Sequence, residues 1–234
     1  MKGKKKIIIL GASGMLGSEI LKIFSYQKNY TIKASLRNLK FKKKLKYKFD
    51  NLKFFKFDIK RDNIKILKKY VKRNTIIINC IGVIKPNILE NDHASVLNAI
   101  RINSVFPYEL NSLINKSNKI YQIATDCVFD GYKGGYKENS LHNAQDVYGK
   151  TKSLGEVRGN NFFNLRTSII GKEIKEKKSL FEWFNNQKNF SQVNGYTNHL
   201  WNGLTTKAYA YALISIINNK INLPNFIHLI PDKK

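Results

Sequence analysis

The chain has 234 residues, a hydrophobic share of 42% and a formal net charge of +26 at pH 7, which allows one large domain or a domain with a small lobe. No apolar run approaches the roughly 18 residues of a membrane-spanning helix, the N-terminal apolar run is too short for a signal peptide, and the two cysteines lack metal-ligand spacing, so we expect a cytoplasmic protein with no membrane partner and no metal site. The basic excess comes without any nucleic-acid recognition motif, and we do not expect nucleic acid as a partner.

The first elements are a buried strand, a glycine-rich turn and a helix. Residues 7–10 are all apolar, which predicts a strand buried on both faces, and the spacing of residues 15–24 predicts a helix. Gly11, Gly14 and Gly17 lie between and within them. Glycine lets a phosphate approach the backbone, and the helix N-terminus supplies N–H donors and partial positive charge. In a strand–turn–helix context this spacing predicts a dinucleotide-binding site.

The next strands bear on cofactor preference. Strands are predicted at 30–34, 52–57 and 75–81, with a helix at 63–71. A site that prefers NAD usually has Asp or Glu at the end of the second strand, whereas this chain has Ser35 and Arg37. These side chains could bind a 2′-phosphate, which favours NADPH, with NADH as the alternative. Asp58 and Ile59, after the third strand, are placed to meet the adenine.

The remaining elements continue the alternation of strands and helices. A long helix is predicted at 93–114, strands at 119–124, 161–166 and 226–230, and helices around Tyr148 and at 209–217. This order predicts an α/β fold, a doubly wound parallel sheet of the Rossmann type with a small C-terminal substrate lobe. We assign residues 1–171 to an NADP-binding domain and 172–234 to the lobe, with 205–234 partly returning to the first domain. The abrupt end after the last strand suggests truncation.

A tyrosine–lysine pair is the candidate catalytic centre. Tyr148 and Lys152 are four residues apart, so they share one face of a helix. A nearby ammonium group favours the phenolate and brings the tyrosine pKa down from about 10. Thr125 follows a predicted buried strand, at the sheet end where substrates bind. Its hydroxyl could bond a substrate carbonyl while Tyr148 protonates it. A pair on the protein surface without a role is the alternative.

Together these features resemble a known superfamily. Gly11-x-x-Gly14-x-x-Gly17, Thr125 and Tyr148-x-x-x-Lys152 resemble the extended short-chain dehydrogenases/reductases. Residues 79–83, 125–131 (TDCVFDG), 165–168 (LRTS) and 201–206 (WNGLTT) look like the dTDP-4-dehydrorhamnose reductase family. The resemblance implies a Rossmann domain that holds NADPH and a smaller lobe that closes over a nucleotide-sugar. It also implies reduction of a 4-keto-6-deoxy sugar nucleotide for surface polysaccharide synthesis.

The resemblance also implies roles for individual residues. The glycines would hold the pyrophosphate, and Thr125 would position the sugar carbonyl. Tyr148 would be the general acid, while Lys152 lowers its pKa and bonds the nicotinamide ribose. The cofactor set is Gly11, Ser13, Gly14, Met15, Leu16, Gly17, Ser35, Arg37, Asp58, Ile59, Cys80, Ile81, Gly82, Asn103, Tyr148 and Lys152. The substrate set is Val83, Asp126, Cys127, Arg166, Trp201, Asn202 and Thr205.

Some alternatives remain open at this stage. Cys127 stands where the family usually has an aromatic residue, either as a small packing residue or as a reactive thiol, so the sugar is uncertain. An epimerase or dehydratase on the same fold often carries an extra acid/base pair, which Asp126 and Cys127 do not supply. A regulatory subunit of the methionine adenosyltransferase type would tolerate loss of Tyr148. A salt-sensitive nucleic-acid binder is a further alternative. A homodimer is compatible with the sequence.

Overall fold

The computed structural model describes residues 3–45, 50–174 and 179–231. At its centre, parallel strands form one sheet of seven, in the order β3-β2-β1-β4-β5-β6-β9. The strands are β1 (Lys5–Leu10), β2 (Tyr30–Leu36), β3 (Leu52–Lys56), β4 (Thr75–Asn79), β5 (Lys119–Ala124), β6 (Phe162–Arg166) and β9 (Phe226–His228). The chain winds outward from β1 in both directions, so the crevice for a ligand lies where β1 meets β4. The α/β prediction is confirmed.

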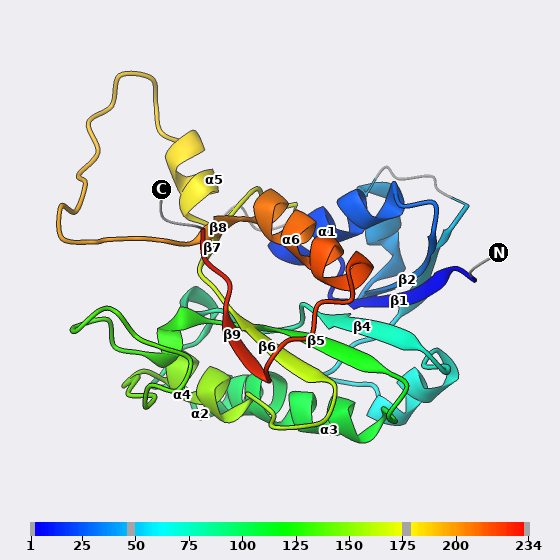
Figure 1. Ribbon diagram of the computed structural model, residues 1–234. Helices are drawn as coiled ribbons and strands as arrows, with labels where there is room; N and C mark the ends of the chain where they lie inside the picture. The colour runs from blue at the N-terminus through cyan, green and yellow to red at the C-terminus, as the bar shows by residue number, and fades with distance from the viewer. Residues whose placement is uncertain (1–2, 46–49, 175–178, 232–234) are drawn as a thin grey trace.

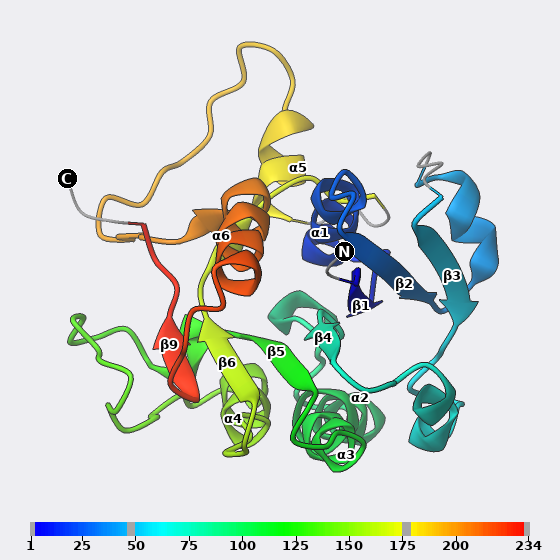
Figure 2. The ribbon, with the colours of Figure 1, turned by 45° about the vertical axis from the view of Figure 1, so that its right-hand side comes forward.

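Two helical layers cover the sheet. One face carries α1 (Met15–Ser25) and α6 (Thr206–Asn218), and the other carries α2 (His93–Ala99), α3 (Phe106–Ser112) and α4 (Val147–Leu154), as Figures 1 and 2 show. Short 3₁₀ helices connect the strands at η1 (Leu39–Lys43), η2 (Ile64–Lys69), η3 (Lys85–Asn87) and η5 (Asp126–Val128). Among the described residues no helix is long and apolar enough to cross a membrane.

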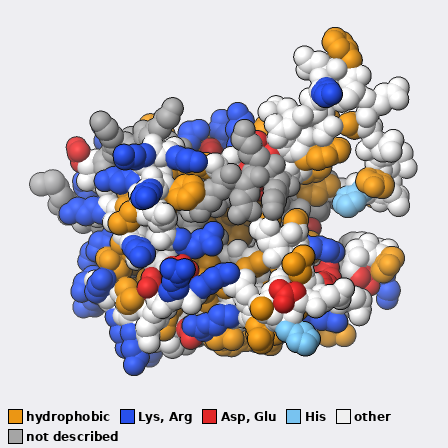
Figure 3. Space-filling view, turned by 180° about the vertical axis from the view of Figure 1, so that it is seen from behind, with side chains coloured by type: hydrophobic (Ala, Val, Ile, Leu, Met, Phe, Trp, Pro, Cys, Tyr) orange, Lys and Arg blue, Asp and Glu red, His pale blue; other side chains and the backbone are white. Residues whose placement is uncertain are grey.

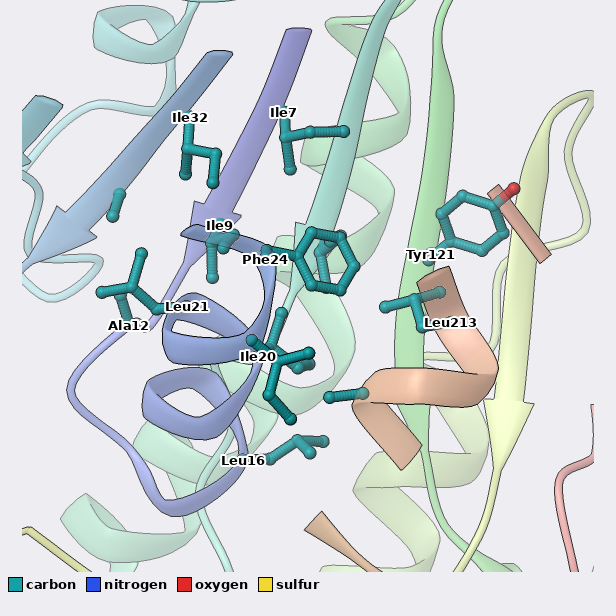
Figure 4. Close-up of a cluster of buried hydrophobic side chains, with 14 of the residues drawn as sticks. Ile7, Ile9, Ala12, Leu16, Ile20, Leu21, Phe24, Ile32, Tyr121 and Leu213 are labelled. Atoms are coloured by element: carbon teal, nitrogen blue, oxygen red, sulfur yellow. The ribbon is translucent and has the colours of Figure 1, made fainter. Parts of the chain in front are cut away.

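The central strand β1 shows why this sequence forms a sheet buried on both sides. Ile7 and Ile9 face the layer of α1 and α6, where they pack with Ile20 and Leu213 (Figure 4). Ile8 and Leu10 belong to the cluster on the opposite face. Side chains of a strand alternate between faces, so a continuous apolar run is what a strand between two helical layers requires.

Two predicted helices differ in detail. The predicted helix at 93–114 is interrupted by a π-helical segment, η4 (Ile100–Val105), between α2 and α3. The side chains of Asn103 and Ser104 in this segment bond to Thr151 on α4, and Pro107 at the start of α3 has no N–H to donate. The predicted helix at 63–71 is the 3₁₀ helix η2, which buries only Leu67.

The chain from residue 169 onward divides between two places. Helix α5 (Leu180–Asn185) and the two-stranded sheet of β7 (Ile169–Ile170) and β8 (Leu204–Thr205) precede α6. Residues 186–203 extend away from the body and carry few basic side chains (Figures 1 and 3). Helix α6 packs on α1, and β9 joins the main sheet. Residues 175–178 and 232–234 of the predicted lobe lie outside the described residues, and its boundary stays a prediction.

Candidate active site

A cavity of about 650 Å³ opens at the carboxyl ends of the strands. The predicted residues that line it are Gly11, Ser13, Gly14, Met15, Leu16, Gly17, Ser35, Arg37, Asp58, Ile59, Cys80, Ile81, Gly82, Val83, Thr125, Asp126, Cys127, Tyr148 and Lys152. The predicted residues outside its lining are Asn103, Arg166, Trp201, Asn202 and Thr205. The fold thus brings the predicted cofactor residues, with one exception, and the catalytic set together in one space.

The glycine turn between β1 and α1 leaves room for a phosphate group. Gly11 has φ +77°, a conformation that favours glycine. A Cβ at Gly17 would lie 2.3 Å from the Gly11 carbonyl oxygen, so the helix could not approach the turn with any other residue. Gly14 caps α1 without a side-chain hydrogen bond, which leaves N–H groups of the first turn for a ligand. These features fit a dinucleotide cofactor.

The end of β2 brings both predicted residues, Ser35 and Arg37, to the cavity. Ser35 is buried and its Oγ accepts a hydrogen bond from Gly11 N–H at 2.9 Å, so its hydroxyl fixes the glycine turn. Arg37 is exposed at the cavity and has no ion pair with any residue of the described ranges. Lys60 also lines the cavity, from the loop after β3, and sequence analysis missed it. Lys60 lies four residues after the end of β3 and directly after Asp58 and Ile59, and a basic residue beside those two predicted contacts is the signal that could have found it.

Asp58 lines the cavity after β3. Its Oδ1 accepts a hydrogen bond from Lys60 N–H at 3.1 Å, and its own N–H donates to Asp62 Oδ2 at 2.7 Å. The carboxylate therefore shapes the turn after β3. Asp58 and Ile59 both line the cavity, and their contact with adenine stays a prediction.

Helix α4 and the end of β5 bring the catalytic candidates together. Asp146 caps α4 and accepts a hydrogen bond from Gly149 N–H at 2.7 Å. Tyr148 and Lys152 follow in α4, and both line the cavity. Thr125 is buried after β5 and shares a hydrogen bond with Tyr148. A hydroxyl, a phenol and an ammonium group therefore line the same cavity.

The two catalytic candidates have shifted pKa values. Burial raises the pKa of Tyr148, and its hydrogen bond with Thr125 opposes that shift. Burial lowers the pKa of Lys152, and the nearby Glu156 carboxylate acts in the opposite direction. The resulting pKa of Lys152 is about 8. Lys152 Nζ donates to the Ile123 carbonyl at 2.7 Å. The Tyr148 pKa thus shifts upward, in contrast to the lowering by Lys152 that the sequence predicted, and the phenol keeps its proton at neutral pH.

Two cysteines lie at the cavity with different exposure. Cys127 is exposed, with its Sγ 3.7 Å from Asp126 Oδ1. Burial raises the pKa of Cys80 to about 12, so that thiol is neutral. A neutral thiol is a poor nucleophile.

In the part of the chain that the structure describes, no three His, Cys, Asp or Glu side chains form a group that could hold a metal ion.

Asn103 holds two parts of the site together. Its Oδ1 accepts a hydrogen bond from Val83 N–H at 2.9 Å, and its Nδ2 donates to the Val83 carbonyl at 3.0 Å and to Thr151 Oγ1 at 3.2 Å. Val83 lines the cavity and Thr151 precedes Lys152. The buried amide thus joins a cavity wall to α4, instead of lining the cavity itself.

The substrate candidates after residue 165 have other contacts. Arg166 is buried and paired with Glu156, with Nη2 2.7 Å from Oε2. Trp201 is half exposed and its Nε1 donates to Oγ of Ser168, a cavity residue, at 2.7 Å. Thr205 caps α6, and Asn202 is exposed. The structure therefore does not gather these residues around the cavity.

Comparisons with known proteins agree with this geometry. Residues 5–229 match the protein family described as RmlD substrate binding domain. The chain is 28% identical over 152 residues to dTDP-4-dehydrorhamnose reductase from Aggregatibacter actinomycetemcomitans, a match that covers 64% of this chain and 45% of that protein. It is 24% identical over 152 residues to methionine adenosyltransferase 2 subunit beta from Bos taurus, which covers 65% and 42%. The matches thus span less than half the length of these relatives.

A solved structure shares the architecture. UDP-glucuronic acid 4-epimerase from Bacillus cereus, in complex with NAD, superposes with a TM-score of 0.75 at 14% identity, over 97% of this chain and 79% of that chain. At this identity the likeness shows the fold alone. It places the chain in the same α/β architecture as an enzyme whose structure contains a bound dinucleotide.

Proposed function

The chain belongs to the RmlD substrate binding domain family, within the extended short-chain dehydrogenases/reductases, and on that premise we propose that it is an NADPH-dependent reductase of a 4-keto-6-deoxy sugar nucleotide. The similarity to a dTDP-4-dehydrorhamnose reductase supports the substrate class. The observation that carries the proposal is the meeting of Thr125, Tyr148 and Lys152 in the cavity that also contains the glycine turn.

Each site residue has its own role in the proposed carbonyl reduction. A bound nicotinamide cofactor supplies the hydride. Tyr148 holds a proton at neutral pH because its pKa is raised, and its hydroxyl donates that proton to the ketone oxygen as the sugar C4 becomes an alcohol. Thr125 orients the carbonyl by a hydrogen bond. Lys152, cationic below a pKa of about 8, stabilises the phenolate that remains.

The proposed preference for NADPH depends on two exposed cations. Arg37 and Lys60 line the cavity after neighbouring strands, β2 and β3, where the adenosine half of a dinucleotide binds in this fold. A 2′-phosphate carries negative charge, and Arg and Lys are the side chains that bind phosphate.

A cytoplasmic role in surface polysaccharide synthesis, and a lobe that closes over the nucleotide-sugar, are parts of the same proposal.

Oxidation of NADPH by the purified protein tests the reductase activity. The substrates would be dTDP-, UDP- and GDP-linked 4-keto-6-deoxy sugars, with NADH as the comparison cofactor. We expect turnover with one nucleotide and a loss of kcat of about 10²- to 10⁴-fold in Tyr148→Phe, with NADPH binding retained, because only the acid is removed. Equal turnover in wild type and Tyr148→Phe would contradict the assignment of the general acid.

A second function has its own support. The match to a methionine adenosyltransferase subunit favours a non-catalytic binding subunit that uses the same fold. In that case the protein would bind NADPH, reduce none of the sugars and bind another protein instead. The intact pair of Tyr148 and Lys152 favours the enzyme, because a binding subunit does not need a proton donor beside its cofactor. Tight NADPH binding without turnover would reverse this preference.

A further inference from the structure

A buried polar cluster lies at the C-terminal end of α4, around the guanidinium of Arg166. Its Nε donates to Glu156 Oε1 at 2.8 Å, and Nη2 donates to Oε2 at 2.7 Å. Nη1 donates to the Glu138 carbonyl at 3.0 Å and faces His228 Nε2 at 3.2 Å, while Nη2 also faces His142 Nε2 at 2.9 Å. A guanidinium has five N–H donors and no acceptor, so each of its hydrogens has a partner here.

This arrangement fixes the protonation of two histidines. Because Arg166 can only donate, the Nε2 atoms of His142 and His228 must accept, and neither can carry a hydrogen. Both rings are therefore neutral, with their hydrogen on Nδ1. His142 Nδ1 lies 2.6 Å from Ser153 Oγ, which accepts that hydrogen. A second proton on either ring would place it against the guanidinium, with no electron pair left to accept.

The charges around His142 favour its neutral form. Burial is the largest cause that lowers the pKa of His142, and Arg166 and His228 lower it further. Glu156 raises it, and Glu156 Oε2 lies 3.7 Å from His142 Nε2. That carboxylate is closer to Arg166, at 2.7 Å, and the net shift is downward. The ring is thus held as an acceptor.

The charges around His228 act in the same way. Burial lowers the pKa of His228, and Arg166 lowers it as well. Glu138, Glu156 and Asp126 each raise it, and Glu138 Oε1 also accepts a hydrogen bond from the His228 backbone N–H at 3.0 Å. The net direction is again downward, in agreement with the geometry.

The cluster holds the end of the helix that carries the proposed catalytic pair. Ser153 lies in α4 and Glu156 follows it, while Arg166 and His228 are register partners in β6 and β9. We propose that His142 and His228 are positioning residues: as neutral acceptors for Arg166 they hold α4 against β6 and β9, and their protonation releases it. The effect on catalysis rests on the proposed function, whereas the assignment of the tautomers does not.

The chain provides its own matched controls. It has four histidines, and the other two, His93 and His199, are exposed. Glutamine has a carbonyl oxygen that accepts a hydrogen bond and does not titrate, so His142→Gln and His228→Gln keep an acceptor, while His93→Gln and His199→Gln change only the surface. The measurements are kcat and melting temperature between pH 5 and 8, with ¹⁵N NMR of the ring nitrogens in the wild type at pH 7.5.

In the wild type we expect two Nδ1–H tautomers and a kcat that falls about tenfold per pH unit for each proton taken up, once the pH is below the lowered pKa values of the two rings. The fall in kcat and in melting temperature should move to lower pH in His142→Gln and His228→Gln, and stay unchanged in the two surface variants. An Nε2–H or cationic ring at pH 7.5 would overturn the proposal, even if a variant fails to fold.

Two further outcomes separate the proposals. If kcat falls over the same low pH range in all four variants, the positioning role is refuted. The protein could also show the expected tautomers and melting behaviour but reduce no sugar. This result would support the role of the cluster in holding α4 and would contradict only the proposed reductase activity.

Discussion

Removing the two exposed cations at the proposed adenosine end of the cavity tests the cofactor preference directly. Arg37 and Lys60 line the cavity from the loops after β2 and β3, and both side chains are exposed. Two unit charges 4 Å apart attract by about 1 kcal/mol in water and about 4 kcal/mol at an effective dielectric constant of 20. Because both cations face solvent, a value near the lower limit applies, about 1–1.5 kcal/mol each, or roughly tenfold in affinity.

The double variant Arg37→Ala/Lys60→Ala is therefore expected to bind NADPH about 100-fold more weakly at low salt, with the affinity for NADH unchanged. Titration calorimetry with each cofactor at low and high NaCl measures this, and the difference should shrink as salt screens the charges. Lys65→Ala, which removes an exposed lysine of η2 outside the cavity lining, is the control. Equal affinities of the wild type for NADPH and NADH, or an equal loss for both in the variant, would refute the reasoning.

Three other substitutions test the site and the core. Gly17→Ala would place a Cβ 2.3 Å from a backbone oxygen, so we expect at least tenfold weaker NADPH binding and about 1–3 kcal/mol lower stability, by calorimetry and urea unfolding. Leu213→Ala, at a fully buried position, should lower the free energy of unfolding by about 2–5 kcal/mol; a loss below 1 kcal/mol would show that the layer of α6 collapses around the gap. Lys152→Met should abolish activity yet raise the free energy of unfolding at pH 7 by about 1–3 kcal/mol, because the buried ammonium has its pKa lowered from 10.5 to about 8. The folded wild type binds fewer protons than the unfolded chain between those values, so its stability should rise with pH there, while that of the variant should not. Urea unfolding at pH 7 and 10 checks this sign.

The strands were predictable because their signal is local. The run at 119–124 is both the predicted and the observed extent of β5, and the other predicted strands of the main sheet differ from the observed ones by a few residues at their ends. A strand between two helical layers has to be apolar on both sides, which a single sequence shows directly. The glycine turn, Tyr148 and Lys152 were predictable for the same reason, since spacing within one turn or helix places them.

Long-range partners were not predictable in this way. Arg166 follows a buried strand, as a substrate residue would, but its partners come from positions 138, 142, 156 and 228, up to 62 residues away in the chain. Nothing near Arg166 in the sequence indicates that five acceptors surround it. Ser35 is a similar case, because its bond to Gly11 depends on the pairing of β1 with β2. A side chain whose type and position suggest ligand binding can thus already form its hydrogen bonds within the protein.

The pKa shifts of Tyr148 and Lys152 have opposite directions, and their combination fits the proposed reduction. Burial disfavours charge on both groups, so Tyr148 retains its proton at neutral pH, while Lys152 lies only about one unit above neutrality with a pKa of about 8. In the proposed reduction, a proton transferred from the phenol leaves a phenolate in the cavity that Lys152 also lines, and the attraction between phenolate and ammonium exists only after the transfer begins. In the proposed reduction the pair would therefore stabilise the transition state more than the resting site, which is the condition for faster chemistry. The carboxylate of Glu156 keeps Lys152 charged against burial, and Arg166 in turn holds that carboxylate in place. If the proposed function holds, the cluster behind α4 would affect catalysis through a charge as well as through position.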